Sequence, residues 1–420
     1  MARTLTPQDC HVIMEELVKE ATGQNNIGSV NSSNFVSAGE MVLATGTENT
    51  LNALSLIIGR TLIAVRPYKA KLALINRLDT GAYTDRLRKI SYYSDNPLPA
   101  GDWNTQLYTN LAEGYDNGTN SGASVESQWA QHRKTPLELN FAGSNVWDYV
   151  LTIYENQLKK AFRDEESFSA FLNGMMTEMA NDIESEREAY NRMTLLNYMA
   201  CVYDMDAPGS KVNMTTAYNT YFGTNHTTQE LMSDYLPSFL EFFVSEFKRI
   251  SDMMTHRTVN YHSFPALTGK AILRHTPKEK QRLFLYNDFL RKAEAIVKPG
   301  IFNPEYIAFP DRQFEGVDYW QSVNSPSEIN VTPAIPDFDS TSPTYGTQIA
   351  GSAVTEDYVI GFLFDEDGCM TNFQLEEVNT TGLEARKRYR NLIHHFMKNS
   401  LNDATENAVI FFMNDDDVTP

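Results

Sequence analysis

The segment FSAFLNGMMTEMANDIESEREAYNRMTLLNY, residues 168–198, decides how the rest of the chain can be arranged. Its apolar side chains recur every three or four residues, which predicts a helix with one apolar stripe. The stripe contains Phe168, Phe171, Leu172, Met175, Met176, Met179 and Ile183. The helix should span roughly 30 residues, or about 45 Å at 1.5 Å per residue. That is long for a helix of an ordinary globular domain.

The other face of the predicted helix is acidic. It includes Glu184, Glu186 and Glu188, with only scattered arginines between the carboxylates. The helix therefore combines one stripe that needs burial with one negative face. A second helix, through Val150, Ile153, Tyr154 and Leu158, is expected to lead into it.

A basic segment with strand character precedes these helices. Residues 60–93 are rich in Lys and Arg, among them Arg86, Arg88 and Lys89. Aromatic and β-branched residues at 82–94 and again from Lys134 predict two strands. The stretch between them, residues 95–128, is polar and rich in Gly and Asn. This order predicts a long two-stranded hairpin with an extended loop at its tip.

The N-terminal region combines helices with a polar arm. Thr6 and Pro7 predict the start of a helix that ends near Gly23, and a further helix is expected at 50–60. Residues 24–46 are rich in Gly, Asn and Ser and contain too few apolar residues for a core of their own. Such a segment loses conformational entropy when it orders, so it needs a surface that buries its apolar side chains. These are Phe35, Val36, Met41 and Leu43.

The region beyond residue 206 mixes helices and strands. The pattern predicts a helix over 229–254, a strand followed by a helix over 282–296, and a strand over 358–364. Residues 310–356 are rich in Ser, Thr and Pro and are expected to form extended surface loops. Two final strands are predicted at 389–397 and 408–413.

Length and composition set limits on the class of protein. The 420 residues are 42% hydrophobic, so the chain can bury a substantial core. Its formal net charge of −19 argues against binding nucleic acid over its whole surface. Three widely spaced cysteines favour a reducing compartment rather than a disulfide framework. The sequence shows neither a secretory signal nor an apolar run long enough to span a bilayer.

Candidate sites for chemistry have simpler structural interpretations. His394 and His395 are adjacent, and neighbours on a strand point to opposite faces, so they do not suit one metal ion. Asp365, Asp367 and Gly368 resemble the start of a calcium loop but lack its closing glutamate, which favours a plain turn. The sequence contains no phosphate-binding loop, dinucleotide fingerprint or nucleophile elbow. We therefore assign no catalytic, cofactor-binding or metal-binding residues.

The sequence also contains one dense basic cluster. It consists of Arg386, Lys387, Arg388 and Arg390, beside Tyr389. It could contact nucleic acid or an acidic protein surface. The negative charge of the chain favours protein.

The order of these parts resembles the major capsid proteins of tailed bacteriophages, whose fold was first described for a Hong Kong phage, and especially their podovirus-like branch. The resemblance rests on the layout and on four segments. These are LSLIIGR from Leu54, RLRKI from Arg86, LKKAF from Leu158 and VIGFLFDEDGCM from Val359. It implies an α+β fold with an N-terminal arm (1–66), an extended loop (67–145), a spine helix (146–205), an axial domain (206–375) and closing strands of the peripheral domain (376–420).

The resemblance also implies a function without catalysis. Copies of the chain would form the hexamers and pentamers of an icosahedral head that encloses double-stranded DNA. Expected partners are a separate scaffolding protein, a portal and decoration proteins, with weak non-specific DNA contact and no membrane. The protein would be made in the bacterial cytoplasm and end in the virion. An encapsulin-like compartment shell, another virion structural protein and a cytosolic enzyme are the alternatives.

Two sets of residues are candidates for contacts between copies. The apolar residues of the arm, Phe35, Val36, Met41 and Leu43, would be buried by neighbours. Arg86, Arg88 and Lys89 of one copy would pair with Glu184, Glu186 or Glu188 of the next, and such complementary charge would set register and association rate.

Overall fold

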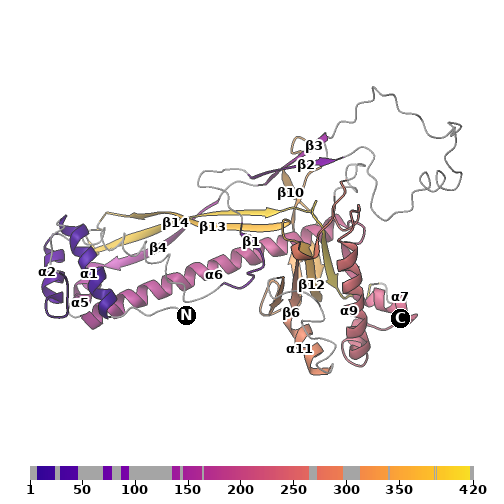
Figure 1. Ribbon diagram of the computed structural model, residues 1–420, viewed down its shortest axis with the longest axis horizontal. Helices are drawn as coiled ribbons and strands as arrows, with labels where there is room; N and C mark the ends of the chain where they lie inside the picture. The colour runs from indigo at the N-terminus through magenta and orange to yellow at the C-terminus, as the bar shows by residue number, and fades with distance from the viewer. Residues whose placement is uncertain are drawn as a thin grey trace.

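The computed structural model describes residues 7–23, 29–45, 70–77, 87–93, 135–141, 145–162, 165–263, 272–296, 313–338, 341–382, 384 and 386–416. The molecule is α+β and elongated, with a long arm joined at one end to a second lobe (Figure 1). The predicted helix at 50–60, the loop at 95–128 and Arg86 lie outside the described residues.

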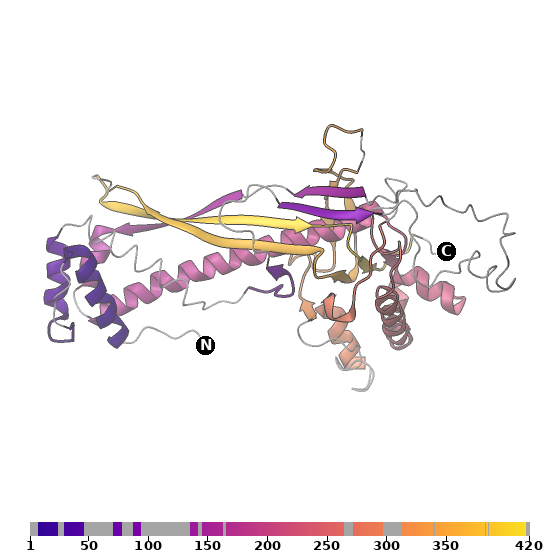
Figure 2. The same ribbon diagram turned by 45° about the horizontal axis from the view of Figure 1, so that its top comes forward.

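The long helix is confirmed and is longer than predicted. It is α6, Glu165–Met205, and its 41 residues correspond to about 60 Å. It runs along one face of a four-stranded sheet, which the two ribbon views show (Figures 1 and 2). The strand order is β1 (Asn76–Arg77), β13 (Cys369–Thr380), β14 (Tyr389–Asn402) and β4 (Asn145–Tyr154).

The predicted lead-in helix is corrected in part. Residues 145–154, which include Val150, Ile153 and Tyr154, form strand β4, and only the short helix α5, Glu155–Ala161, follows it. Val146 and Val150 are 64% and 50% exposed on one face of β4, while Ile153 on the other face is 3% exposed. This alternation, with many β-branched and aromatic residues, is strand behaviour.

The second lobe is built on a five-stranded sheet. The strand order is β5 (Lys211–Asn213), β15 (Ala408–Phe412), β12 (Val359–Asp365), β6 (Gln281–Tyr286) and β7 (Phe314–Val317). Every residue of β12 and β15 is buried. Helices pack on this sheet: α7 (Met214–Phe222), α8 (Thr228–Leu231), α9 (Leu236–Met253) and α11 (Asn287–Ile296). Because β15 pairs with β12, the last strand belongs to this lobe, which corrects its assignment to the peripheral domain.

Short strands replace some of the predicted surface loops. Within 310–356 the chain forms two further two-stranded sheets, β8 (Ile329–Val331) with β11 (Val354–Glu356) and β9 (Ala334–Pro336) with β10 (Gln348–Ala350). A 3-10 turn, η1 (Lys278–Lys280), precedes β6. None of the described helices is long and apolar enough to cross a membrane.

The predicted two-stranded hairpin is confirmed. Strands β2 (Leu87–Tyr93) and β3 (Thr135–Phe141) pair antiparallel along their whole length. Leu137, Leu139 and Phe141 are buried on the underside of β3, in a cluster with Ile272, Phe338 and Leu401. The base of the loop is thus packed on the rest of the chain.

The N-terminal arm contains two helices at the far end of α6. Helix α1 is Pro7–Thr22 and α2 is Phe35–Ala44. Both contribute to an apolar cluster with Phe168 and Leu172 of α6 and Leu392 of β14. Gly39 of α2 allows a close approach, because an added Cβ would lie 3.2 Å from the Phe162 ring. The arm segment therefore packs on its own chain.

Candidate functional site

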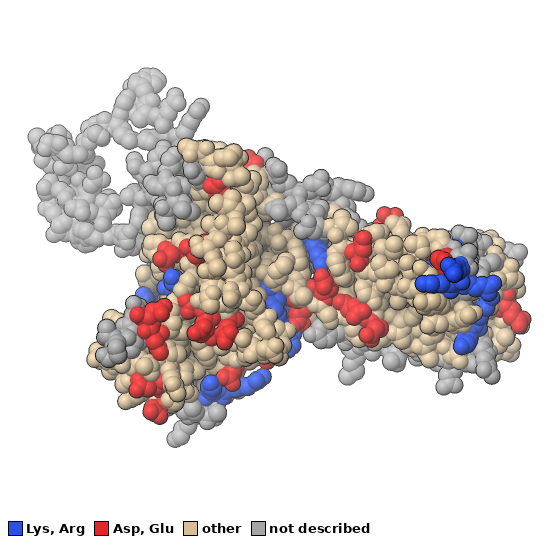
Figure 3. Space-filling view, turned by 180° about the vertical axis from the view of Figure 1, so that it is seen from behind, with Lys and Arg blue, Asp and Glu red and all other residues tan. Residues whose placement is uncertain are grey.

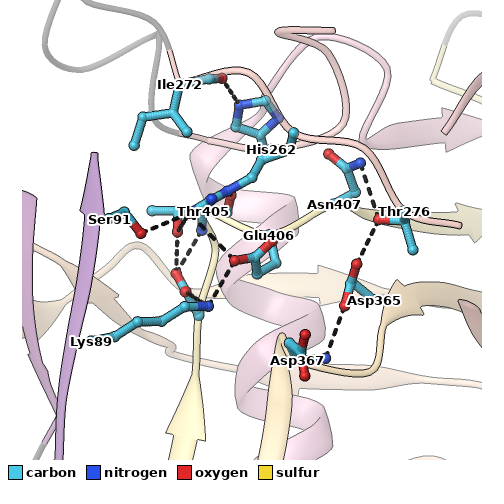
Figure 4. A network of polar contacts seen from close by, with 12 residues as sticks. Lys89, Ser91, His262, Ile272, Thr276, Asp365, Asp367, Thr405, Glu406 and Asn407 are labelled. Atoms are coloured by element: carbon cyan, nitrogen blue, oxygen red, sulfur yellow. Dashed lines mark hydrogen bonds and ion pairs between the residues drawn. The ribbon is translucent and has the colours of Figure 1, made fainter. Parts of the chain in front are cut away.

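A buried ionic group fixes the hairpin to the second lobe (Figure 4). Lys89 projects from β2, and its Nζ lies 2.5 Å from Asp403 Oδ2 and 2.7 Å from Glu406 Oε1. The Asp403 side chain is 0% exposed, while that of Lys89 is 24% exposed. Both carboxylates lie in the turn between β14 and β15. The Lys89 ammonium of the hairpin thus lies between two carboxylates of this turn.

Arg274 completes this group from a third segment. Its guanidinium donates to Ser91 Oγ of β2 at 2.8 Å and to the Thr405 carbonyl at 3.0 Å. It also lies 3.3 Å from Glu406. Two cations therefore balance two carboxylates, as burial in a low-dielectric site requires. We call Lys89, Arg274, Asp403 and Glu406 the hairpin latch.

The environment shifts the pKa values of the latch in opposite directions. Burial alone would lower the pKa of Lys89, but attraction to Asp403 and Glu406 outweighs it and raises the pKa. For Asp403, burial acts upward, yet the nearby Lys89 ammonium holds the pKa below its usual value. Burial is the largest effect on Glu406 and raises its pKa. Glu406 is therefore the carboxylate that protonates first on acidification.

The turn that holds these carboxylates is itself tied down by hydrogen bonds. Asp403 Oδ1 accepts from the Thr405 amide at 2.9 Å and from its hydroxyl at 2.6 Å. Nearby, Thr276 donates to Asp365 Oδ2 at 2.7 Å and accepts from Asn407 at 3.2 Å. These hydrogen bonds restrict the orientation of the groups they join. The latch thus rests on a fixed support.

The turn predicted after the strand at 358–364 is confirmed in the same region. Asp365 Oδ1 accepts from the Asp367 amide at 2.9 Å, and the Gly368 amide donates to the Asp365 carbonyl at 2.9 Å. Burial is the main cause that raises the pKa of Asp365. Across the described residues, no group of three or more His, Cys, Asp or Glu is placed to hold a metal ion.

A second set of contacts holds residues 70–75, which precede β1. Leu72 and Leu74 donate their backbone amides to the two oxygens of Glu315, at 2.6 and 3.2 Å. Glu184 and Glu188 of α6 accept from the amides of residues 70 and 71, at 3.3 and 3.1 Å. We call residues 70–75 with these three carboxylates the clasp. The clasp joins α6 to β7. It therefore connects the elongated part of the molecule, which is built on α6, to the second lobe.

The acidic residues of α6 thus have partners within the chain. Glu184 also pairs with Arg187 at 2.8 Å, and Glu188 pairs with Arg192 at 2.9 Å. Glu186 lies 2.6 Å from Lys398 of β14. The acidic face expected for pairing with a neighbour is therefore partly directed toward the sheet and the clasp.

The basic members of the expected pairing are placed differently. Lys89 belongs to the latch, which corrects the expectation that it faces a neighbour, because its partners Asp403 and Glu406 lie in the same chain. Arg86 lies outside the described residues, and Arg88 lies on β2. Pairing of Arg88 with another copy stays a prediction.

The apolar residues of the arm divide into two groups. Phe35 is 1% exposed, with its ring 5.6 Å from that of Phe168, so its own chain buries it and the expected contact with a neighbour is corrected. Leu43 is partly buried on the same cluster. Val36 and Met41 are 44% and 46% exposed and stay candidate contacts.

The two histidines lie on opposite faces of β14, as predicted. His395 is 2.5 Å from Asp148 on the neighbouring strand. His394 is fully buried on the face toward α6, and neither ring nitrogen has a hydrogen-bond partner among the described residues. Burial, and to a smaller extent the nearby His395, lowers the pKa of His394 to about 4.

Sequence reasoning missed most of the latch and the clasp. Asp403 and Thr405 have the spacing of an Asx turn, which is a local signal that could have been found. The ion pair of Lys89 with Glu406 and the contact of Leu72 with Glu315 join residues far apart in the chain. No local pattern indicates such partners.

Comparison with known proteins identifies the family. A protein-family model described as "Phi29-like phage major capsid protein" matches residues 97–412, which is most of the chain. The chain belongs to this family. It is therefore a major capsid protein of a phage head and a component of the virion, and an encapsulin-like shell is not favoured. The family match and the mixture of helices and strands in the structure agree with the α+β fold expected from the resemblance. No curated protein matches the chain.

Several solved structures of phage particles are similar to the capsid protein at low sequence identity. One is titled "Capsid structure of Staphylococcus phage Andhra", with 11% identity, a TM-score of 0.42, and coverage of 84% of this chain and 86% of that one. A second, of the head fiber and inner core protein gp22 of bacteriophage P68, has 8% identity, a TM-score of 0.47, and coverage of 82% and 84%. The capsid structure of the cyanophage P-SCSP1u has 12% identity, a TM-score of 0.37, and coverage of 80% and 85%.

Proposed function

We propose that the capsid protein assembles without catalysis into hexamers and pentamers of an icosahedral head that encloses double-stranded DNA. The observation that carries this proposal is the attachment of the hairpin by the latch. Lys89 of β2 pairs with Asp403 and Glu406 in the turn that joins β14 of the arm sheet to β15 of the second lobe. A closed shell needs every copy to present its contact surfaces in the same orientation.

The anchoring has a mechanical consequence. Apolar burial of Leu137, Leu139 and Phe141 supplies attachment, and the ion pairs of Lys89 supply direction. The loop between β2 and β3, residues 94–134, thus leaves from a base of fixed orientation. We propose that it reaches a neighbouring copy, with Val36, Met41 and Arg88 as further contacts.

The partners follow from this assembly. A separate scaffolding protein, a portal and decoration proteins would join the shell, and packaged DNA would make weak, non-specific contacts. The excess of acidic residues, 54 against 35 basic ones, disfavours strong binding to DNA phosphates. Synthesis would take place in the cytoplasm of the bacterial host.

Electron microscopy of the purified protein tests the proposal. We expect closed shells, with or without an added scaffolding protein, and six-fold and five-fold clusters in averaged images. Tubes or open rings would instead favour another virion structural protein. A discrete monomer or dimer at every concentration and salt condition would contradict self-assembly.

A further inference from the structure

The end of α6 remote from the second lobe carries a basic patch of which the sequence reveals only one part. Lys159 and Lys160 lie in α5, and Arg386, Lys387 and Arg388 lie in the turn before β14. The two segments are adjacent because Tyr154, just before α5, pairs with Tyr389, just after the turn. All five basic side chains are exposed. We call them the basic end.

The turn presents its cations on a rigid frame. The Glu384 amide donates to the Tyr389 carbonyl at 3.0 Å, and the Arg388 amide donates to the Glu384 carbonyl at 2.8 Å. The Glu384 carboxylate also accepts from the Lys387 amide. Arg388 has a φ of 55°, a left-handed conformation that Gly or Asn would adopt at lower cost. Strained backbone positions of this kind cluster at functional sites.

Arg390, in contrast, does not belong to the patch. It is 3% exposed, because successive residues of β14 point to opposite faces of the sheet. The dense cluster in the sequence is thus divided by the strand, and α5 supplies the other two cations. The patch therefore combines segments more than 200 residues apart in the chain.

An apolar groove adjoins the basic end. It has a volume of about 680 Å³ and lies between α2 and α5. Val36, Leu43 and Phe162 supply its apolar surface, while Glu40, Lys159 and Lys160 supply its charged groups. A ligand that fits this groove would have an apolar side chain to pack on Val36, Leu43 and Phe162. It would also have acidic groups beside that side chain to pair with Lys159 and Lys160.

Charge is distributed unevenly along the molecule. Viewed from behind, basic side chains gather at the end where α1, α2 and α5 lie, while acidic ones are spread over the second lobe (Figure 3). Two copies that met end to end would bring like charges together, which is unfavourable. Contact between the basic end and an acidic surface elsewhere on the next copy would be attractive.

We propose that the basic end and its groove bind an acidic surface of a second copy in a heterologous contact. This inference rests on the proposed assembly and names one of its contacts. Protein is favoured over nucleic acid because the site includes an apolar groove and the carboxylate of Glu40. Binding to DNA phosphates needs neither. A heterologous contact also lets copies continue around a closed shell.

A matched pair of double variants tests this contact. Lys160→Glu with Lys387→Glu reverses two charges of the basic end, and Lys248→Glu with Arg257→Glu reverses two exposed charges of the second lobe. Shell formation is followed by light scattering and electron microscopy over a range of protein and salt concentrations. Binding of a labelled DNA duplex is measured by fluorescence anisotropy. Circular dichroism checks that each variant is folded.

The expected result is specific to the basic end. Its double variant should need at least about ten times more protein to form shells at low salt, with a smaller difference at high salt. The control should assemble like the wild type. Val36→Asp should also impair assembly, and because it acts through the groove it tests the contact without altering a basic residue.

Three outcomes would overturn the inference. Assembly of the basic-end variant at the wild-type concentration would exclude the contact. Normal assembly with loss of duplex binding would assign the basic end to nucleic acid instead. Failure of the wild type itself to form shells would refute the proposed function together with the contact. This outcome differs from a failure of the contact alone, in which the wild type forms shells.

Discussion

Replacing Lys89 by Met tests whether the hairpin latch holds the base of the loop. Methionine retains most of the apolar stem but removes the ammonium group. Asp403 would then stay fully buried without its nearest cation, and Arg274, 3.3 Å from Glu406, would be the cation left in the group. The apolar underside of β3 would keep its contacts. The variant therefore isolates the ionic part of the attachment.

The magnitude follows from burial. Removal of one partner of a buried ion pair costs about 3–5 kcal/mol, because the other charge is left uncompensated. The Lys89 side chain is 24% exposed, so water can relieve part of this cost. We expect a loss of about 2–3 kcal/mol in the free energy of opening the hairpin. That corresponds to roughly a 30- to 150-fold faster exchange of its protected amides.

Hydrogen exchange of the unassembled protein measures this change segment by segment. Faster exchange should be confined to residues 87–93, 135–141 and the 403–407 turn. The pH dependence has a definite sign. The pKa of Asp403 is lowered in the fold, so its stabilisation is present above the unfolded pKa and is lost as pH falls. The wild type and the variant should therefore differ most at neutral pH.

Two controls sharpen the test. Lys89→Arg keeps the charge and should retain most of the protection. Asp403→Asn combined with Lys89→Met removes the uncompensated charge, so the double variant should lose less than the sum of the single variants. Unchanged protection in Lys89→Met, or an equal difference at neutral and acidic pH, would refute the ionic account of the latch.

Three other substitutions test separate parts of the fold. Burial lowers the pKa of His394 from an ordinary value of 6.5 to about 4, so stability should fall by up to about 3 kcal/mol as pH drops from 7 to 4. His394→Leu should remove that loss, and identical acid unfolding curves would contradict it. Glu315→Gln should weaken the clasp by about 1–2 kcal/mol, seen as faster proteolysis within residues 70–77, while full resistance would argue against the clasp. Gly361→Ala places a Cβ 2.4 Å from Leu285 Cδ2 and 2.9 Å from a backbone oxygen, so the melting temperature should fall, with a cost of about 1–3 kcal/mol. An unchanged melting temperature would show that the sheet adjusts.

Local patterns predicted the elements whose periodicity is strong. The long helix, the β2–β3 pairing and the strand followed by a helix at β6 and α11 are confirmed. The predicted lead-in helix failed because β4 mixes a buried and an exposed face, and its apolar residues also match a helical spacing over a few positions. Residues 369–380 were missed as a strand because polar residues such as Asn372 alternate poorly with apolar ones.

The candidate contacts show what local reasoning cannot supply. The negative face of α6 was recognised, but Glu184 and Glu188 accept hydrogen bonds from a segment more than 100 residues earlier. The basic cluster was recognised as well, yet strand alternation removes Arg390 from it and β-pairing adds Lys159 and Lys160. In both cases the sequence showed the charged residues. Which residues lie next to them depended on the tertiary fold.

The latch also explains why the base of the hairpin is ionic when apolar packing could hold it. An apolar underside such as that of β3 can slide by two residues and still bury a similar face. Lys89 and Arg274 allow less freedom, because their partners lie within 2.5–3.3 Å at defined positions. Replacing Lys89, Arg274, Asp403 and Glu406 together by apolar residues removes both cations and both carboxylates, so it should preserve stability to within about 1–2 kcal/mol. It should nevertheless yield misassembled shells in electron micrographs, because the loops of different copies would no longer leave in one direction. Uniform, closed shells from this quadruple variant would show that packing alone sets the direction of the loop.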